Sequence, residues 1–224
     1  MEKYNLAFKY RIYLNDIQEE LILKTFGCTR LVYNKFLAQR KELYETEKKS
    51  VTYNTQMKEL PVLKNELEFL KEIDSISLQI TLKNLEIAYK NFFQKRTSFP
   101  KFKSKKSTRK SYSTNNVNNS IRLVDKYIKL PKLGLVKIKL HRNMPLSHII
   151  KSVTISQEPN GAFYVSILKF FRKYQDKLTK LQRELFRKVK FSQNWYKAKL
   201  KVAKLHQIIK IVEKIFYINY HINL

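Results

Sequence analysis

The stretch KYNLAFKYRIYL, residues 3–14, alternates regularly between apolar and polar side chains. Its apolar positions share one face: Tyr4, Leu6, Phe8, Tyr10, Ile12 and Leu14. The opposite face carries Lys3, Lys9 and Arg11. A period of two predicts a β-strand with one buried face and one wet, basic face. The strand precedes a long helical region, and we expect it to join strands supplied by the second half of the chain.

Three helical segments follow this strand, at about residues 15–47, 54–70 and 74–92. Asn15 or Asp16 can cap the first, and Asp74 is the predicted N-cap of the third. We expect an interruption of the first at Gly27-Cys28 and a break in the second near Pro61, because glycine and proline weaken a helix interior. The apolar stripes of these segments predict the core of a small helical bundle.

The segment 94–110 contains eight basic residues and no acid. The aromatic residues Phe99, Phe102 and Tyr112 lie within it or close to it. Closely spaced charge with aromatic neighbours suits phosphate binding and occasional base stacking. We therefore predict a nucleic-acid-binding patch that consists of Lys95, Arg96, Lys101, Lys103, Lys105, Lys106 and Arg109.

The next part of the chain contains short strand-like runs, at residues 121–123, 127–130, 135–140, 149–156 and 162–169. Asn160-Gly161, between two alternating runs, is a strong hairpin signal. These runs predict a small antiparallel barrel or sheet, and the chain as a whole is expected to be an α+β protein. Lys137, Lys139 and Arg142 lie on or just after one strand, and they extend the predicted nucleic-acid-binding set.

The region from Arg172 to Lys204 is again helical in pattern and densely basic, with twelve lysines and arginines against two acids. It can be a solvated helical hairpin, and the charge imbalance favours contact with nucleic acid at least as strongly. The segment from Ile208 to Leu224 changes to isoleucine, tyrosine, asparagine and phenylalanine, and it has no clean helical face.

The overall charge points to a polyanionic partner. The 224 residues carry 46 lysines and arginines against 18 acids, a formal net charge of +28, and only four of the acids are aspartates. Neutralising phosphates releases their counterions, so nucleic acid is the simplest partner for such a field. Metal sites that cleave phosphodiesters need several clustered carboxylates, and this sequence offers few.

The remaining composition narrows the class of protein further. A single cysteine, Cys28, excludes an intrachain disulfide framework and a four-cysteine zinc ribbon within these residues. No apolar stretch approaches the length of a membrane span, and the N-terminus lacks an apolar signal core. We therefore expect a cytoplasmic protein with no membrane partner and no small-molecule substrate.

Several blocks of sequence resemble one known family. The blocks AYKNFFQKR (88–96) with FPKFKSKK (99–106), and LPKLGLVKIKLHR (130–142), are the most specific. Over residues 3–169 the chain resembles the N-terminal part of the TnpB (OrfB) proteins of IS200/IS605- and IS607-type insertion sequences. Those proteins are RNA-guided DNA nucleases. The resemblance implies a wedge barrel split by a helical recognition insert, followed by an RNase H-like RuvC domain with a zinc ribbon.

The resemblance gives an expected domain plan for this chain. The fold class is α+β, a split antiparallel β-barrel (the wedge) with an inserted helical bundle and a basic helical remnant of a RuvC domain. The expected parts are a wedge strand (1–14), a helical recognition insert with an OrfB helix-turn-helix-like N-terminal region (15–112), the wedge barrel (113–171), a RuvC-derived helical remnant (172–206) and a frameshifted tail (207–224).

The departures from the family bear on catalysis. In the family an Asp-x-Gly motif follows the last wedge strand, whereas here Lys169-Phe170-Phe171 leads directly into a basic helical segment. We expect an internal deletion between about 168 and 172, and a frameshifted C-terminal end. The three RuvC acids that hold two metal ions and the zinc-ribbon cysteines have no counterpart. The sequence therefore predicts no enzyme activity, no catalytic residue, and no magnesium or zinc cofactor.

The resemblance also implies residues that read a short DNA motif beside the target. The matching positions are Tyr53, Ser75, Gln79, Thr114 and Asn115. Glutamine and asparagine side chains suit bidentate contact with adenine edges. An alternative is that Tyr53 is a core residue and Gln79 a solvated helix position.

The leading hypothesis is a nucleic-acid-binding remnant of an OrfB-type transposase, a product of a transposable element associated with transposition and DNA recombination. Its expected partners are a guide-like RNA and double-stranded DNA. The first alternative is a nuclease-dead, RNA-guided repressor. Further alternatives are an active transposase or nuclease, for which the carboxylates are lacking, and a generic basic RNA-binding protein.

Overall fold

The computed structural model describes residues 5–108, 110–141, 149–170 and 173–221. The chain divides into two compact units. The sheet–helix unit comprises Ala7–Met144 with Ile150–Lys169, and the hairpin unit comprises Phe170–Leu224 with the short segments Met1–Leu6 and Pro145–Ile149.

The order of elements is strand, helices, strands, helices, as the sequence predicts. The helices are α1 (Asp16–Glu47), α2 (Tyr53–Glu66), the 3-10 helix η1 (Glu68–Lys71), α3 (Ser75–Phe93), α4 (Lys173–Phe186) and α5 (Gln193–His221). The strands are β1 (Asn5–Tyr13), β2 (Lys110–Asn115), β3 (Arg122–Val124), β4 (Tyr127–Leu130), β5 (Gly134–Lys139), β6 (Ile149–Gln157) and β7 (Phe163–Phe170).

Helix α1 is continuous over 32 residues, so the interruption expected at Gly27-Cys28 is wrong. Asn15 caps its start, and Gln18 completes a capping box. The local cost of a glycine in a helix interior is about 1 kcal/mol relative to alanine. Packing on both sides of Gly27 outweighs this cost, because the residues before it and after it are buried in two different cores.

Helix α2 continues through Pro61, so the break expected there is also wrong. Proline removes one backbone hydrogen bond, but Leu60 and Leu63 bury the helix on both sides of it. The helix ends instead at Glu66, before η1. The prediction for α3 is confirmed, because the Asp74 carboxylate accepts a hydrogen bond from the backbone N–H of Ile76.

The seven strands form one sheet in the order β2-β6-β7-β1-β5-β4-β3. Strand β1 lies between β7 and β5, so the isolated N-terminal strand joins the strands of the second half, as expected. The ladders β1–β5, β2–β6, β3–β4 and β4–β5 are antiparallel. The described pairings leave β2 and β3 at open edges, so the sheet is not closed into a barrel.

Strand β2 was not predicted, because its sequence KSYSTN is polar and carries few strand-forming residues. Tertiary pairing decides its conformation: Lys110–Asn115 pair with β6 residue by residue, from Lys110 opposite Gln157 to Asn115 opposite Ser152. Its inward side chains, Tyr112 and Thr114, are buried. The structure therefore places Tyr112 in the core, where its ring meets Phe26 at a centroid distance of 5.8 Å, and it cannot stack on a base.

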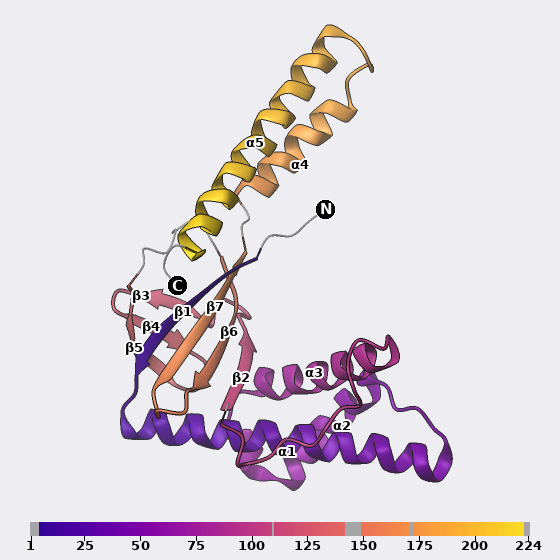
Figure 1. Ribbon diagram of the computed structural model, residues 1–224, viewed down its shortest axis with the longest axis vertical. Coiled ribbons are helices and arrows are strands. Elements are labelled where there is room, and N and C mark those ends of the chain that lie inside the picture. The colour runs from indigo at the N-terminus through magenta and orange to yellow at the C-terminus, as the bar shows by residue number, and fades with distance from the viewer. Residues whose placement is uncertain (1–4, 109, 142–148, 171–172, 222–224) are drawn as a thin grey trace. The chain divides into compact units, whose positions relative to one another are not determined.

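Two apolar cores stabilise the sheet–helix unit, and α1 contributes to both. Ile22 and Phe26 pack into the core beneath the sheet. Further along the same helix, Val32, Phe36 and Leu37 pack against α2 and α3. Figure 1 shows α1 passing from one end of the sheet to the helical bundle. This shared helix joins the sheet to the bundle in one unit.

The hairpin unit consists of α4 and α5, whose facing sides bury Leu178 and Leu205. Helix α5 continues to His221, so most of the segment expected to lack a helical pattern is helical. Within the part of the chain that the structure describes, no helix has the length and apolar character of a membrane span.

Candidate nucleic-acid interface

The outer face of the sheet gathers basic side chains from strands that are far apart in the sequence. The register of β1 and β5 sets Arg11 opposite Lys139, and Tyr13 opposite Lys137. Residues directly opposite in an antiparallel ladder point to the same face. Arg122 on β3 and Lys129 on β4 form a further opposed basic pair. We define the basic sheet face as Arg11, Arg122, Lys129, Lys137 and Lys139.

This face is poorly neutralised by the protein itself. No residue of the basic sheet face forms an ion pair with an acid among the residues that the structure describes. Lys9, next along β1, differs because its Nζ lies 2.5 Å from the carboxylate of Glu158. Like charges directly opposite one another destabilise a sheet, and a bound polyanion removes this repulsion.

A second basic surface is the loop after α3. We define the basic loop as Lys95, Arg96, Lys101, Lys103, Lys105 and Lys106, all of which are exposed. The end of α3 fixes its start, because Lys95 adopts a positive φ of 57° and Arg96 donates its backbone N–H to the carbonyl of Asn91. Phe99 and Phe102 are exposed within the same loop. The loop therefore presents the combination of charge and aromatic surface that the sequence predicts.

Helix α1 holds the middle of the basic loop. Asn34 Nδ2 donates to the carbonyl of Lys103 at 3.0 Å, and Asn34 Oδ1 accepts from its N–H at 2.8 Å. The Lys103 ammonium lies over the ring of Tyr33, 4.2 Å from the centroid. Desolvation there lowers the pKa of Lys103 from its ordinary value, and burial raises the pKa of Tyr33. The loop is thus fixed to the bundle at one residue, while its other cations face solvent.

The start of α3 lies against β2. The Thr114 hydroxyl donates a hydrogen bond to Asp74 Oδ2, and the Asp74 Oδ1 atom caps the helix. Thr114 is only 1% exposed, so it supports this junction and presents no surface to DNA. Its neighbour Tyr112 has a pKa raised mainly by burial and further by the charge of Asp74.

The structure brings together only part of the motif-reading set predicted from the family. Ser75 and Gln79 lie about one turn apart at the start of α3, directly after Asp74, which is the residue bonded to Thr114. Ser75 also accepts a hydrogen bond from Lys64. Tyr53 is eleven residues before Lys64 on α2, roughly 16 Å along the helix axis, and it packs against the helical core.

The remaining predicted residues differ in their surroundings. Asn115 is exposed, and it points to the face of β2 opposite to Thr114. Lys137 and Lys139 are exposed on the basic sheet face. Arg109 and Arg142 lie outside the described residues.

The predicted set omits four residues that the structure makes prominent: Arg11, Asn34, Arg122 and Lys129. Arg11 belonged to the wet, basic face predicted for the first strand, but its position opposite Lys139 depends on long-range pairing. Lys129 on β4 and Arg122 on β3 join the same face through the pairing of their strands with β5 and with each other. No local pattern distinguishes Asn34, whose partner Lys103 lies in a distant loop.

The residues of the described ranges provide no ligand set for the family's metals. No group of three His, Cys, Asp or Glu side chains comes together there in a way that could hold a metal ion. Cys28 is buried in the helical core, where burial raises the pKa of its thiol.

Comparison with family models finds a match for the N-terminal region of the chain. A helix-turn-helix domain model, that of the OrfB proteins of IS605 elements, matches residues 1–49. In this chain the described part of that region forms β1 and the continuous α1, with no turn between two helices. The match covers only these first residues, and here the region joins the sheet to the helical bundle, because α1 contributes to both cores.

Comparison with individual proteins extends the relationship to nearly the whole chain. It is 32% identical over 247 aligned positions to InsQ of Escherichia coli (strain K12), a proposed RNA-guided DNA endonuclease, with 93% of this chain and 60% of InsQ covered. A proposed RNA-guided DNA endonuclease of Streptomyces pristinaespiralis is 31% identical, with 92% and 60% covered. The virulence protein VsdF of Salmonella dublin is 34% identical over 110 positions, with 44% and 92% covered.

These matches confirm the resemblance to the TnpB (OrfB) proteins, and the chain belongs to that family. It spans about three fifths of the length of its two long relatives.

Proposed function

We propose that this chain is a cytoplasmic nucleic-acid-binding protein of transposon origin, which binds a guide-like RNA and double-stranded DNA without cutting the DNA. The observation that carries this proposal is the register that sets Arg11 opposite Lys139, while neither cation forms an ion pair with an acid among the described residues. Phosphate groups would relieve the repulsion between these cations. The names of InsQ and its Streptomyces counterpart support RNA and DNA as the two polyanions.

The sheet is proposed to be the family's wedge, with α1–α3 as the helical recognition insert. The support is topological: α1–α3 lie in the sequence between β1 and β2, while β1 pairs with β5 in the middle of the sheet. The helices therefore interrupt a sheet whose strands come from both sides of them. The motif-reading residues of the insert would be Ser75 and Gln79, with Asn115 on the adjoining strand.

The helices α4 and α5 are proposed to be what remains of a RuvC domain after an internal deletion. The alignment with InsQ has 247 positions, whereas 93% of 224 residues is about 208. About 39 aligned positions are therefore filled in InsQ alone. A deletion just before α4, where the sequence lacks the Asp-x-Gly motif, accounts for a gap of this size.

The binding proposal is tested by the salt dependence of affinity. The purified chain is titrated against labelled single-stranded RNA and duplex DNA by fluorescence anisotropy. If about 6–10 phosphates are neutralised, the affinity falls about 10³–10⁵-fold between about 50 and 200 mM salt. An affinity that does not change with salt would contradict the proposal. Sequencing the RNA that co-purifies with the chain then tests for one discrete guide-like species.

The absence of cleavage is tested separately. The chain, loaded with its co-purified RNA, is incubated with plasmid and oligonucleotide duplexes in Mg²⁺ and in Mn²⁺. Two-metal hydrolysis requires clustered carboxylates, so we expect the substrates to remain intact in both. Metal-dependent nicking that survives repurification and disappears with EDTA would show that the chain is an enzyme.

A further inference from the structure

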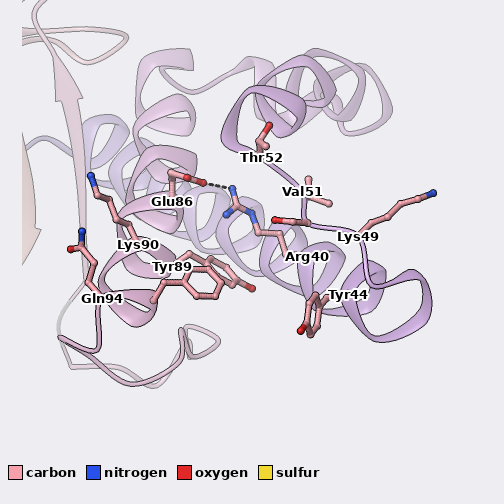
Figure 2. A pocket seen from close by; sticks show the side chains of 11 residues that line it. Arg40, Tyr44, Lys49, Val51, Thr52, Glu86, Tyr89, Lys90 and Gln94 are labelled. Atoms are coloured by element: carbon pink, nitrogen blue, oxygen red, sulfur yellow. Dashed lines mark hydrogen bonds and ion pairs between the residues drawn. The ribbon is translucent and has the colours of Figure 1, made fainter.

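The helical bundle contains a pocket that the nucleic-acid interface does not use. It has a volume of about 440 Å³ and lies between the second half of α1, the link into α2 and the second half of α3. Figure 2 shows that the lining residues Arg40 and Tyr44 come from α1, and that Glu86, Tyr89 and Lys90 come from α3. A volume of this size is in the range of sites for small ligands.

A buried arginine forms one wall of this pocket. Arg40 is only 7% exposed, its Nε donates to Gln56 Oε1 at 2.9 Å, and its Nη2 donates to Glu86 Oε2 at 2.8 Å. A guanidinium group has five N–H donors. The other three have no hydrogen-bond acceptor among the described residues. Buried donors are normally paired, so this side chain is prepared for an acceptor that enters the pocket.

The surroundings of Arg40 favour an anionic acceptor. Lys90 lines the pocket without an acidic partner among the described residues, while Lys49 is paired with Glu47 at 2.6 Å. Glu86 is the single acidic residue of the lining. The pocket also includes Thr52, the N-cap of the 14-residue α2, where the helix dipole attracts negative charge.

Aromatic side chains complete the site. The guanidinium of Arg40 covers one face of Tyr89, 4.9 Å from the ring centroid. Tyr44 and Phe93 line the same pocket and are 60% and 74% exposed. Exposed rings at the edge of a pocket offer flat apolar surface, on which a planar base stacks.

We infer that this pocket binds one nucleotide, with the phosphate near Arg40 and Lys90 and the base against Tyr44 or Phe93. The chemistry is that of a nucleoside monophosphate. It can be a free nucleotide or a single nucleotide of an RNA strand, and the strand source rests on the proposed function. The size, the cations and the exposed rings all fit this ligand, whereas inorganic phosphate alone would leave the aromatic surface uncovered.

The test is calorimetric titration of the full chain with AMP, adenosine and inorganic phosphate at near-physiological salt. We expect AMP to bind with a dissociation constant below about 1 mM, and the two fragments to bind at least about tenfold more weakly. Because Arg40 is buried and its loss would disturb the fold, the variants are Lys90→Gln and Phe93→Ala. Their matched controls on the same helix are Lys83→Gln and Ile87→Ala, which lie outside the pocket lining.

The variants decide whether AMP binds in this pocket. Lys90→Gln and Phe93→Ala are each expected to weaken AMP binding about tenfold, while both controls leave it unchanged. No AMP binding, or equal losses in variants and controls, would overturn the inference.

The source of the nucleotide is decided by competition with single-stranded RNA. If AMP competes with the RNA and Phe93→Ala weakens both, the pocket holds a nucleotide of the strand. If neither added AMP nor the Phe93→Ala change alters RNA binding, the ligand is a free nucleotide. If the chain binds RNA but shows no binding of AMP, this inference alone is overturned. If the chain binds AMP but no RNA, the proposed function is overturned and the AMP result still stands.

Discussion

The side-chain amide of Asn34 on α1 is bonded in both directions to the backbone of Lys103, in a loop that the sequence places far away. The amide oxygen and nitrogen pair with the backbone of Lys103 as a neighbouring β-strand would. They fix the position of the basic loop on the bundle, where the Lys103 ammonium lies over the ring of Tyr33. The cations on either side of Lys103 are thus held near one another before any polyanion binds, which lowers the entropic cost of binding.

We predict that Asn34→Ala weakens RNA and DNA binding about three- to tenfold without unfolding the chain, because the loop must then be ordered on binding. Hydrogen exchange of the Lys103 amide should become faster. The matched control is Asn65→Ala, on the exposed side of α2. Unchanged affinity together with faster exchange at Lys103 would mean that the basic loop does not contact the ligand.

Charge-removing variants of the basic sheet face form a second prediction. Lys137→Gln and Lys139→Gln should each reduce the slope of log affinity against log salt by about 1, since each removes about one phosphate contact. In the double variant this slope should be reduced by about 2. Lys58→Gln on α2 has the same change of charge at an exposed position away from the sheet, and it should leave the slope nearly unchanged. Equal slopes in all of these variants would exclude the sheet as the interface.

The bond between Thr114 and Asp74 predicts a coupled effect on stability. Thr114→Val and Asp74→Ala should each lower the free energy of unfolding by about 1–2 kcal/mol, because each removes a partner of the α3 N-cap. The double variant should be less destabilised than the sum of the two, by about 1 kcal/mol. Urea unfolding measures all three.

Ser111→Ala, on the exposed side of β2, is the control for the Thr114 and Asp74 variants. It should change the free energy of unfolding by less than about 0.5 kcal/mol. Strict additivity of Thr114→Val and Asp74→Ala would mean that the two side chains are not coupled in solution.

Tyr112 predicts a loss of stability at high pH. Burial raises the pKa of Tyr112 in the folded state, so above pH about 10 the unfolded chain releases this proton while the folded chain retains it. Stability should therefore fall as pH rises above about 10, and Tyr112→Phe should make that fall shallower by up to about 1.4 kcal/mol per pH unit. Tyr127→Phe removes an exposed tyrosine, so its stability should depend on pH in the same way as that of the unsubstituted chain. Parallel curves for all three would refute the assignment.

Much of the fold was predictable because its signals are local. The alternation in residues 3–14 predicted β1, the Asp74 carboxylate predicted the start of α3, and Asn160-Gly161 predicted the turn between β6 and β7. Each signal depends on the backbone preferences of a few neighbouring residues. The family resemblance rests on the same kind of evidence, since its most specific blocks, at residues 88–106 and 130–142, are contiguous stretches of sequence.

The errors share one physical cause, which is packing between distant segments. Gly27 and Pro61 weaken a helix in isolation, yet buried side chains on both sides of each keep α1 and α2 continuous. Strand β2 has little strand propensity and forms because β6 supplies its hydrogen bonds. In the sequence, Tyr112 resembles an exposed aromatic residue that could stack on a base beside the basic patch. The pairing of β2 with β6 directs its ring into the core instead.

The sequence by itself determined the sign and amount of charge, the order of strands and helices, and the family. Composition and local periodicity are properties of the chain that need no neighbour in space. The tertiary structure alone decided which cations act together: it placed Arg11 opposite Lys139, pinned Lys103 to Asn34 and enclosed Arg40 beside Tyr89. Those relationships depend on strand register and helix packing, which are set by burial over the whole unit.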